Sequence, residues 1–183
     1  DVMRTLVALQ PSYLPWSGYF DQLDRADIFV HYDDVQFDKQ SWRNRNRIKT
    51  REGVQWLTVP VRQKGRLEQR ICDTEIDNRV PWARKQLQSI AQNYNRATYL
   101  KFYIDELHDI LSRPWHRIAE LDVTLCERIC YWLGASVQFE RSSRLRLEGD
   151  RSERLLALCQ EFGTDHYLTG ASALNYLDVE LFK

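Results

Sequence analysis

The sequence predicts an α/β fold. A short apolar run at 6–9 is followed by an amphipathic stretch at 18–26 and by a run of β-branched and aromatic residues at 28–32. Strand, helix and strand in this order indicate a parallel βαβ unit with a right-handed crossover. A second strand–helix–strand pattern follows near the C-terminus, and helical periodicity fills roughly 81–133. We therefore expect a mostly parallel, Rossmann-like open sheet with a helical insertion in the middle of the chain, built as a single α/β domain over 1–183.

Length and charge limit the class of protein. The 183 residues are enough for one ordinary core, and 26 basic residues balance 26 acidic ones. Overall charge therefore does not favour a nucleic-acid or membrane partner. Because no apolar run could cross a bilayer and no signal-peptide pattern opens the chain, we expect a cytoplasmic protein without membrane insertion. The four cysteines form no C-x-x-C pair, and we expect buried, reduced thiols.

A rigid loop follows the first strand. The segment Gln10-Pro-Ser-Tyr-Leu-Pro-Trp-Ser-Gly-Tyr19 holds two prolines, which fix φ and remove backbone donors. Stiff loops between a strand and a helix suit the wall of a ligand site. We expect Tyr13, Trp16 and Tyr19 to shape a pocket that stacks a base or a sugar, with Gln10 offering its amide. The alternative is a loop that only plugs the end of the sheet.

Two carboxylates follow the second strand. Asp33 and Asp34 come directly after the run at 28–32, at the edge where parallel sheets bind ligands, and Gln36 lies two residues further on as a further substrate-binding candidate. One aspartate could act as a general base, as an acceptor for a sugar hydroxyl or as a ligand of a divalent metal. Extended geometry points the two to opposite faces. Either could instead pair with an arginine of the segment that follows.

Residues 39–51 are basic and contain no acid. If 42–50 is extended, alternate residues share a face. One face would carry Arg43, Arg45, Arg47 and Lys49, and the other would carry Asn44, Asn46 and Ile48. Because guanidinium groups bind phosphate oxygens bidentately, the basic face predicts a diphosphate clamp, with Trp42 and Asn44 as further contacts. The alternatives are a solvated basic face or, since Trp42 and Trp56 flank the run, a surface for single-stranded RNA.

The rest of the chain supplies further strands, helices and polar turns. The expected elements are strands at 55–61 and 71–76, helices at 82–92, 99–111 and 115–133, a strand at 136–140, a helix at 152–162 and a strand at 165–169. Ser142 and Ser143 follow one of these strands and Gly170 follows another. We expect their hydroxyl and N–H groups to hold phosphate at the same edge of the sheet.

Three motifs carry a resemblance to a known family. They are Gln10-Pro-x-Tyr-x-Pro-Trp-x-Gly-Tyr-Phe20, Phe29-Val-x-Tyr-Asp-Asp-Val35 and Trp42-x-Asn-Arg-Asn-Arg-Ile48. In this order they resemble the WbqC-like protein family, and a weaker likeness continues through 141–143 and 167–170. The resemblance implies a role in bacterial surface-polysaccharide synthesis, particularly in O-antigen gene clusters, with nucleotide-linked sugars as ligands. It supplies no reaction.

Together these observations predict a transferase that acts on a nucleotide-linked sugar in surface-polysaccharide synthesis. Asp33 or Asp34 would be the base or hydroxyl acceptor, and the basic face would clamp the diphosphate. The alternative is a non-catalytic protein that binds a nucleotide-sugar or RNA, although the balanced charge disfavours nucleic acid. No cofactor and no metal site is assigned, with a divalent metal at the aspartates as the open alternative. The sequence does not predict the oligomeric state.

Overall fold

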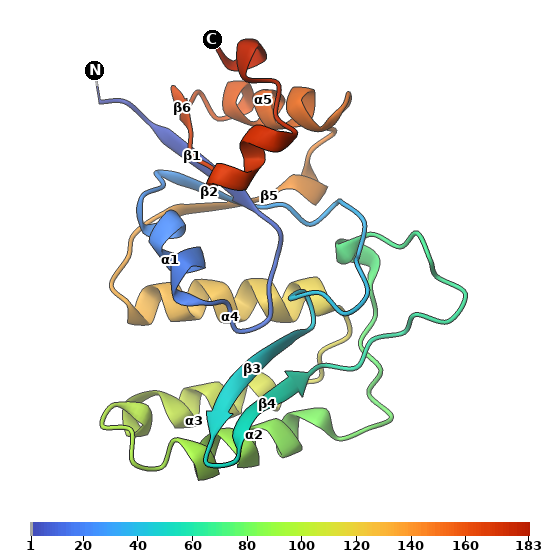
Figure 1. Ribbon diagram of the computed structural model, residues 1–183, viewed down its shortest axis with the longest axis vertical. Coiled ribbons are helices and arrows are strands. Elements are labelled where there is room, and N and C mark those ends of the chain that lie inside the picture. The colour runs from blue at the N-terminus through green and yellow to red at the C-terminus, as the bar shows by residue number, and fades with distance from the viewer. Residues whose placement is uncertain (1) are drawn as a thin grey trace. The chain divides into compact units, whose positions relative to one another are not determined.

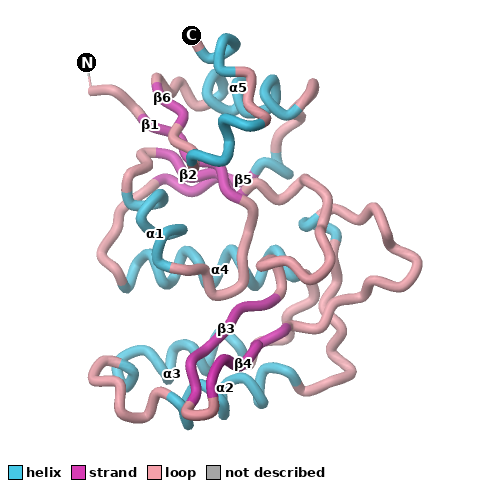
Figure 2. Tube along the Cα trace, in the orientation of Figure 1, coloured by secondary structure: helices cyan, strands magenta, loops and turns pink. Residues whose placement is uncertain are grey.

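The computed structural model describes residues 2–183, and the chain divides into two compact units. The sheet unit comprises the N-terminal residues up to Pro11 together with 16–35 and 127–183, and the hairpin unit comprises 12–15 and 36–126. Figures 1 and 2 show a separate group of strands in each unit. That the whole chain behaves as a single domain stays a prediction.

The sheet unit is organised around parallel strands. Within the described residues its sheet has four strands in the order β5-β2-β1-β6. They are β1 (Thr5–Leu9), β2 (Ile28–His31), β5 (Gln138–Arg141) and β6 (His166–Tyr167). The interiors of β1 and β2 are continuous apolar runs, as expected for parallel strands that are buried on both faces. The prediction of an α/β protein with a mostly parallel sheet is confirmed.

Five α-helices form within residues 2–183, each within three residues of a predicted one. They are α1 (Ser17–Asp24), α2 (Trp82–Asn93), α3 (Leu100–Leu111), α4 (Ile118–Trp132) and α5 (Arg151–Glu161). Helix α4 contributes residues 118–126 to the hairpin unit and 127–132 to the sheet unit. None of these helices combines the length and the apolar character that a membrane crossing requires.

The two faces of the parallel sheet pack against different helices (Figure 1). On one face, Leu6 and Val30 form a buried core with Leu158 of α5. On the other, Phe29 contacts Tyr19 of α1, with 5.7 Å between ring centroids. Because successive side chains of a strand point to opposite faces, both helices are needed to bury these strands.

The hairpin unit carries an antiparallel pair of strands, β3 (Arg45–Thr50) and β4 (Gly53–Thr58). A two-residue turn joins them, and Gly53 adopts φ +119°, a region that side chains with a Cβ rarely enter. Strand β4 thus begins two residues before the predicted start at 55, directly after the turn. It ends at Thr58 and not at 61, two residues before Pro60, which has no N–H to donate. The inner face of the hairpin packs through Leu57 into a core shared with α2, α3 and α4.

The strand expected at 71–76 does not form. Ile71–Asp73 is a short 3-10 turn, and the residues after it make only single bridges, Glu75 with Arg117 and Ile76 with Val61. The Thr74 hydroxyl donates to the carbonyl of Arg70 (2.9 Å), and this local hydrogen bond closes the turn in place of a ladder.

Helix α5 begins with a capping box. The Asp150 side chain accepts from the backbone N–H of Glu153 (3.0 Å), and the Glu153 carboxylate accepts from the backbone N–H of Asp150 (2.7 Å). We expect Asp150→Ala to lower the free energy of unfolding by about 1 kcal/mol, because the backbone N–H of Glu153 loses its acceptor at the helix end. Urea unfolding checks this, and Asp150→Asn, which retains an N-cap acceptor, should lose less.

Candidate functional site

The parallel sheet brings several predicted site residues to one edge. Asp33 and Asp34 follow β2, Ser142 follows β5 and Gly170 follows β6. Since β2 pairs with β5 in parallel, with His31 opposite Arg141, the first three lie next to one another at the carboxyl end of the sheet.

Asp33 is fully buried and ion-paired. Its Oδ2 accepts from Nε and Nη2 of Arg141, at 2.9 and 2.6 Å, and from the Ser143 hydroxyl at 2.9 Å. Its Oδ1 accepts from the backbone N–H of Ser143, also at 2.9 Å. This carboxylate is therefore engaged on both oxygens, and it joins the end of β2 to the end of β5.

Asp34 has a second arginine partner. Its Oδ2 accepts from Nη2 of Arg154 (2.6 Å), and its Oδ1 accepts from the Ser142 hydroxyl (2.6 Å). Nε of Arg154 also donates to the Tyr32 hydroxyl (3.0 Å). Burial opposes the charge of Arg154, but its hydrogen bonds to Tyr32 and Asp34 outweigh this and raise the pKa of the guanidinium. The side chain of Asp34 is 9% exposed, whereas that of Asp33 is at 0%.

The arginines that hold the two aspartates were not predicted. Both come from the C-terminal third of the chain, whereas the sequence suggested partners within 39–51. Arg141 could have been found, because it is the last residue of β5 and faces the edge where β2 ends. Arg154 lies on α5, far from Asp34 in sequence, and no local pattern marks it. Within residues 2–183 no group of three or more His, Cys, Asp or Glu side chains is arranged to hold a metal ion.

The aromatic loop is shared between the units, and two of its rings lie in the sheet unit. Tyr19 is buried, and its hydroxyl donates to the carbonyl of Gln10 (3.2 Å). Trp16 is half exposed and meets Tyr19 edge-on, with 5.6 Å between ring centroids. Gly18 permits this arrangement, because a Cβ there would lie 2.7 Å from Nε1 of Trp16. Tyr19 thus contributes to the core, and Trp16 presents the accessible ring.

Tyr13 lies in the hairpin unit and is completely buried. Its hydroxyl donates to Oε1 of Gln86 (2.5 Å), and the Asn46 side chain donates to its carbonyl (3.2 Å). Burial, and secondarily the nearby Asp122 carboxylate, raise the pKa of the Tyr13 phenol. This ring is part of the core of the hairpin unit.

The strand expected at 42–50 begins only at Arg45, which changes the place of Arg43. Arg43 is half-buried and lies close enough to Asp122 to affect its ionisation. Burial raises the pKa of the Asp122 carboxyl well above its usual value, and the Arg43 guanidinium opposes this only in part.

Asn44 and Gln36 make contacts inside the hairpin unit. Asn44 is buried, and its side-chain amide donates to the carbonyl of Val59 (2.9 Å), which is a structural hydrogen bond. Gln36 donates to the carbonyl of Leu67 (3.2 Å).

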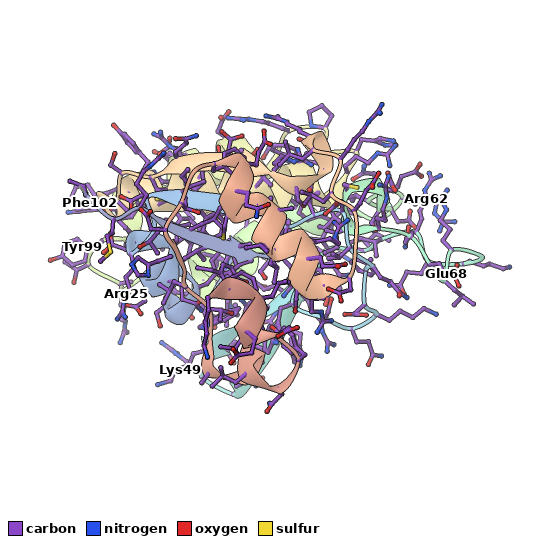
Figure 3. The ribbon with its side chains drawn as sticks, turned by 90° about the horizontal axis from the view of Figure 1, so that it is seen from above. Arg25, Lys49, Arg62, Glu68, Tyr99 and Phe102 are labelled. Carbon is purple, nitrogen blue, oxygen red and sulfur yellow. The ribbon has the colours of Figure 1, made fainter. Side chains whose placement is uncertain are left out.

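The outer face of the hairpin gathers the remaining basic and aromatic residues. We call it the arginine–tryptophan face, formed by Trp42, Arg45, Arg47, Lys49 and Trp56. The two indoles lie 5.6 Å apart and are 37% and 43% exposed. The Arg45 guanidinium lies 4.2 Å from the Trp56 ring centroid, and that of Arg47 lies 5.4 and 5.5 Å from the two indoles. Lys49, labelled in Figure 3, is exposed at the far end of β3.

A family comparison identifies the chain. The model of the WbqC-like protein family matches residues 10–183. The chain belongs to the WbqC-like family. It is also 39% identical over 181 residues to an uncharacterized protein of Mycobacterium tuberculosis, Rv1507c, and the match covers 98% of this chain and 78% of that protein. No solved structure matches.

The motifs that first suggested the WbqC-like family have distinct places in the fold. The first motif supplies the β1–α1 connection with Trp16 and the start of α1 with Tyr19, and the second supplies most of β2 and the residues Asp33 and Asp34 that follow it. The third leads into β3 and supplies the basic half of the arginine–tryptophan face. That these segments converge on one ligand stays a prediction.

Proposed function

We propose that this WbqC-like protein binds a nucleotide-linked sugar and transfers a group onto it during the synthesis of bacterial surface polysaccharide. The pathway rests on what the resemblance implies about O-antigen gene clusters, and the chain's membership of the WbqC-like family agrees with that resemblance. The ligand class rests on the chemistry of the arginine–tryptophan face.

The pairing of indoles with guanidinium groups is the observation that carries the proposal. Accessible Trp42 and Trp56 can stack on a flat base, and Arg45 and Arg47 beside them can bind phosphate oxygens bidentately. The hydrogen bond from Arg45 to the carbonyl of Gln40 holds one guanidinium in place before any ligand arrives. The outward positions of β3 and β4 include no acid that would repel a diphosphate.

The sheet unit supplies the candidate for chemistry. In the order β5-β2-β1-β6, strands β2 and β5 are added on one side of β1 and β6 on the other, and in Rossmann-like sheets such a change of side marks the ligand crevice at the carboxyl ends of the strands. Both aspartates accept hydrogen bonds on both oxygens, so we assign the role of base or hydroxyl acceptor to Asp34 on exposure alone, since its side chain is 9% exposed and that of Asp33 is at 0%. A backbone N–H at Gly170 and the Ser143 hydroxyl are further polar groups at this edge.

Binding can be tested with nucleoside diphosphate sugars. We expect a thermal shift with at least one uridine, guanosine or deoxythymidine diphosphate sugar, since a ligand at 100 times its Kd adds about 2.7 kcal/mol of stability. Trp56→Ala should weaken that binding by about tenfold or more through lost stacking, and Arg47→Ala should weaken it similarly while reducing its salt dependence. Arg25→Ala is the matched control and should bind normally; Arg25 directly follows α1, is exposed and paired with Asp21, and is labelled in Figure 3.

Turnover separates the enzyme from a binding protein. A bound nucleotide-sugar that is converted by the wild type and not by Asp34→Asn supports the transferase. A ligand that binds through the arginine–tryptophan face but is never converted identifies the non-catalytic alternative. Interleaved tryptophan and arginine also fit single-stranded RNA, so a mixed-sequence oligonucleotide belongs in the same titration. Tight oligonucleotide binding without nucleotide-sugar binding would contradict the proposal.

A further inference from the structure

The hairpin unit contains a cleft between the start of α2 and the end of α3. Its volume is about 680 Å³, within the range of small-molecule sites. The floor is mainly apolar and includes Val80, Trp82, Leu87, Ala91 and Leu111. An apolar floor of this size disfavours a sugar and favours a hydrocarbon or aromatic body.

Trp82 provides a fixed apolar wall. Its indole N–H donates to Oδ1 of Asn78 (3.1 Å), and the Asn78 amide donates in turn to the carbonyl of Trp115 (2.7 Å). The polar atom of the indole is therefore already satisfied, so the part of this mostly buried ring that lines the cleft is apolar. The wall is preformed, so little side-chain ordering opposes binding.

The charges of the cleft have one sign. Its lining includes Arg84, Arg113 and the ionisable His108, and no acidic residue. Arg113 is matched by Asp109 outside the cleft, with 3.0 Å between Nη2 and Oδ2. Arg84, in contrast, forms no ion pair with any residue in 2–183 and lies in the first turn of α2, where the helix dipole adds positive potential.

We propose that this cleft binds a small amphiphilic anion, with its apolar body against Trp82 and the other apolar lining residues and its phosphate or carboxylate beside Arg84. The two head groups share the chemistry that a guanidinium recognises. Such a ligand is distinct from the nucleotide-sugar proposed for the arginine–tryptophan face, so this inference does not rest on the proposed function.

Decyl phosphate, decanoate and decanol, each below its aggregation limit, test the proposal by isothermal titration calorimetry. We expect both anions to bind at least tenfold more tightly than decanol. Arg84→Glu should weaken the anions at least tenfold and leave decanol unchanged. Ala91→Trp, which fills the cleft from an exposed helix position, should abolish the binding of all three. If only one of the two anions binds at least tenfold more tightly than decanol, its head group, phosphate or carboxylate, is the one that the cleft recognises.

Two matched variants control for binding elsewhere. Arg96→Glu reverses an exposed charge between α2 and α3 outside this cleft, and Trp56→Ala alters the arginine–tryptophan face; both should bind decyl phosphate as the wild type does. Equal affinity for decyl phosphate and decanol, or anion binding that survives Ala91→Trp in a folded variant, would overturn the proposal. Thermal unfolding of each variant establishes that it is folded.

Discussion

Arg141→Met should lower the free energy of unfolding by about 3–5 kcal/mol. The side chain of Asp33 is completely buried, and Arg141 is the cation that its Oδ2 meets at 2.6 and 2.9 Å. Removing the guanidinium leaves the hydrogen bonds from Ser143 but no opposite charge beside Asp33. A buried carboxylate without a partner destabilises the fold by more than the intact ion pair stabilises it. Urea unfolding at neutral pH measures the loss.

The double variant Asp33→Asn with Arg141→Met should recover much of this loss, because it removes the charge together with its partner. Arg25→Ala is the exposed comparison: its pair with Asp21 has more than half of each side chain in solvent and should contribute no more than about 1 kcal/mol. If Arg141→Met lowered the free energy of unfolding no more than Arg25→Ala does, the ion pair between Asp33 and Arg141 would not stabilise the fold more than an exposed pair.

Asp122→Asn should change how stability depends on pH. Asp122 is fully buried, and burial raises its pKa well above the unfolded value of about 3.9. The folded protein therefore binds a proton more tightly than the unfolded chain does. The contribution of this proton binding to the free energy of unfolding is fully present below about pH 4. It is lost as the pH rises through the folded pKa of Asp122, by up to about 1.4 kcal/mol per pH unit. The charged group that acts on this titration is Arg43, which opposes the shift.

Unfolding free energies of the wild type and Asp122→Asn, measured from pH 4 to 9, test this. The wild-type curve should fall with pH relative to that of the variant, and Asp122→Asn should be the more stable protein at pH 8. Asp109→Asn, an exposed aspartate on α3, should follow the wild type. Parallel curves for the wild type and Asp122→Asn would mean that the buried carboxyl is ionised throughout.

The sequence predicted the segments in which one physical signal dominates. Continuous apolar runs identified β1 and β2, and periodicity placed all five α-helices within three residues of their observed bounds. The signal failed at 71–76, where the Thr74 hydroxyl bond to Arg70 favours a turn over an apolar pattern that is too short to decide. It also misplaced the start of β3, which left Arg43 off the outer face.

For the candidate site, the sequence by itself determined which side chains follow each strand, because the strands and their parallel direction follow from local patterns. This was enough to bring Asp33, Asp34 and Ser142 to one edge, and to place Arg45, Arg47 and Lys49 on one face of a strand. Only the tertiary structure decided which charges meet. Arg141 and Arg154 reach the aspartates from more than 100 residues away along the chain. Asp122 is buried only because α4 packs against the rest of the protein. Ion pairing and burial depend on distances between segments, and no local pattern encodes those distances.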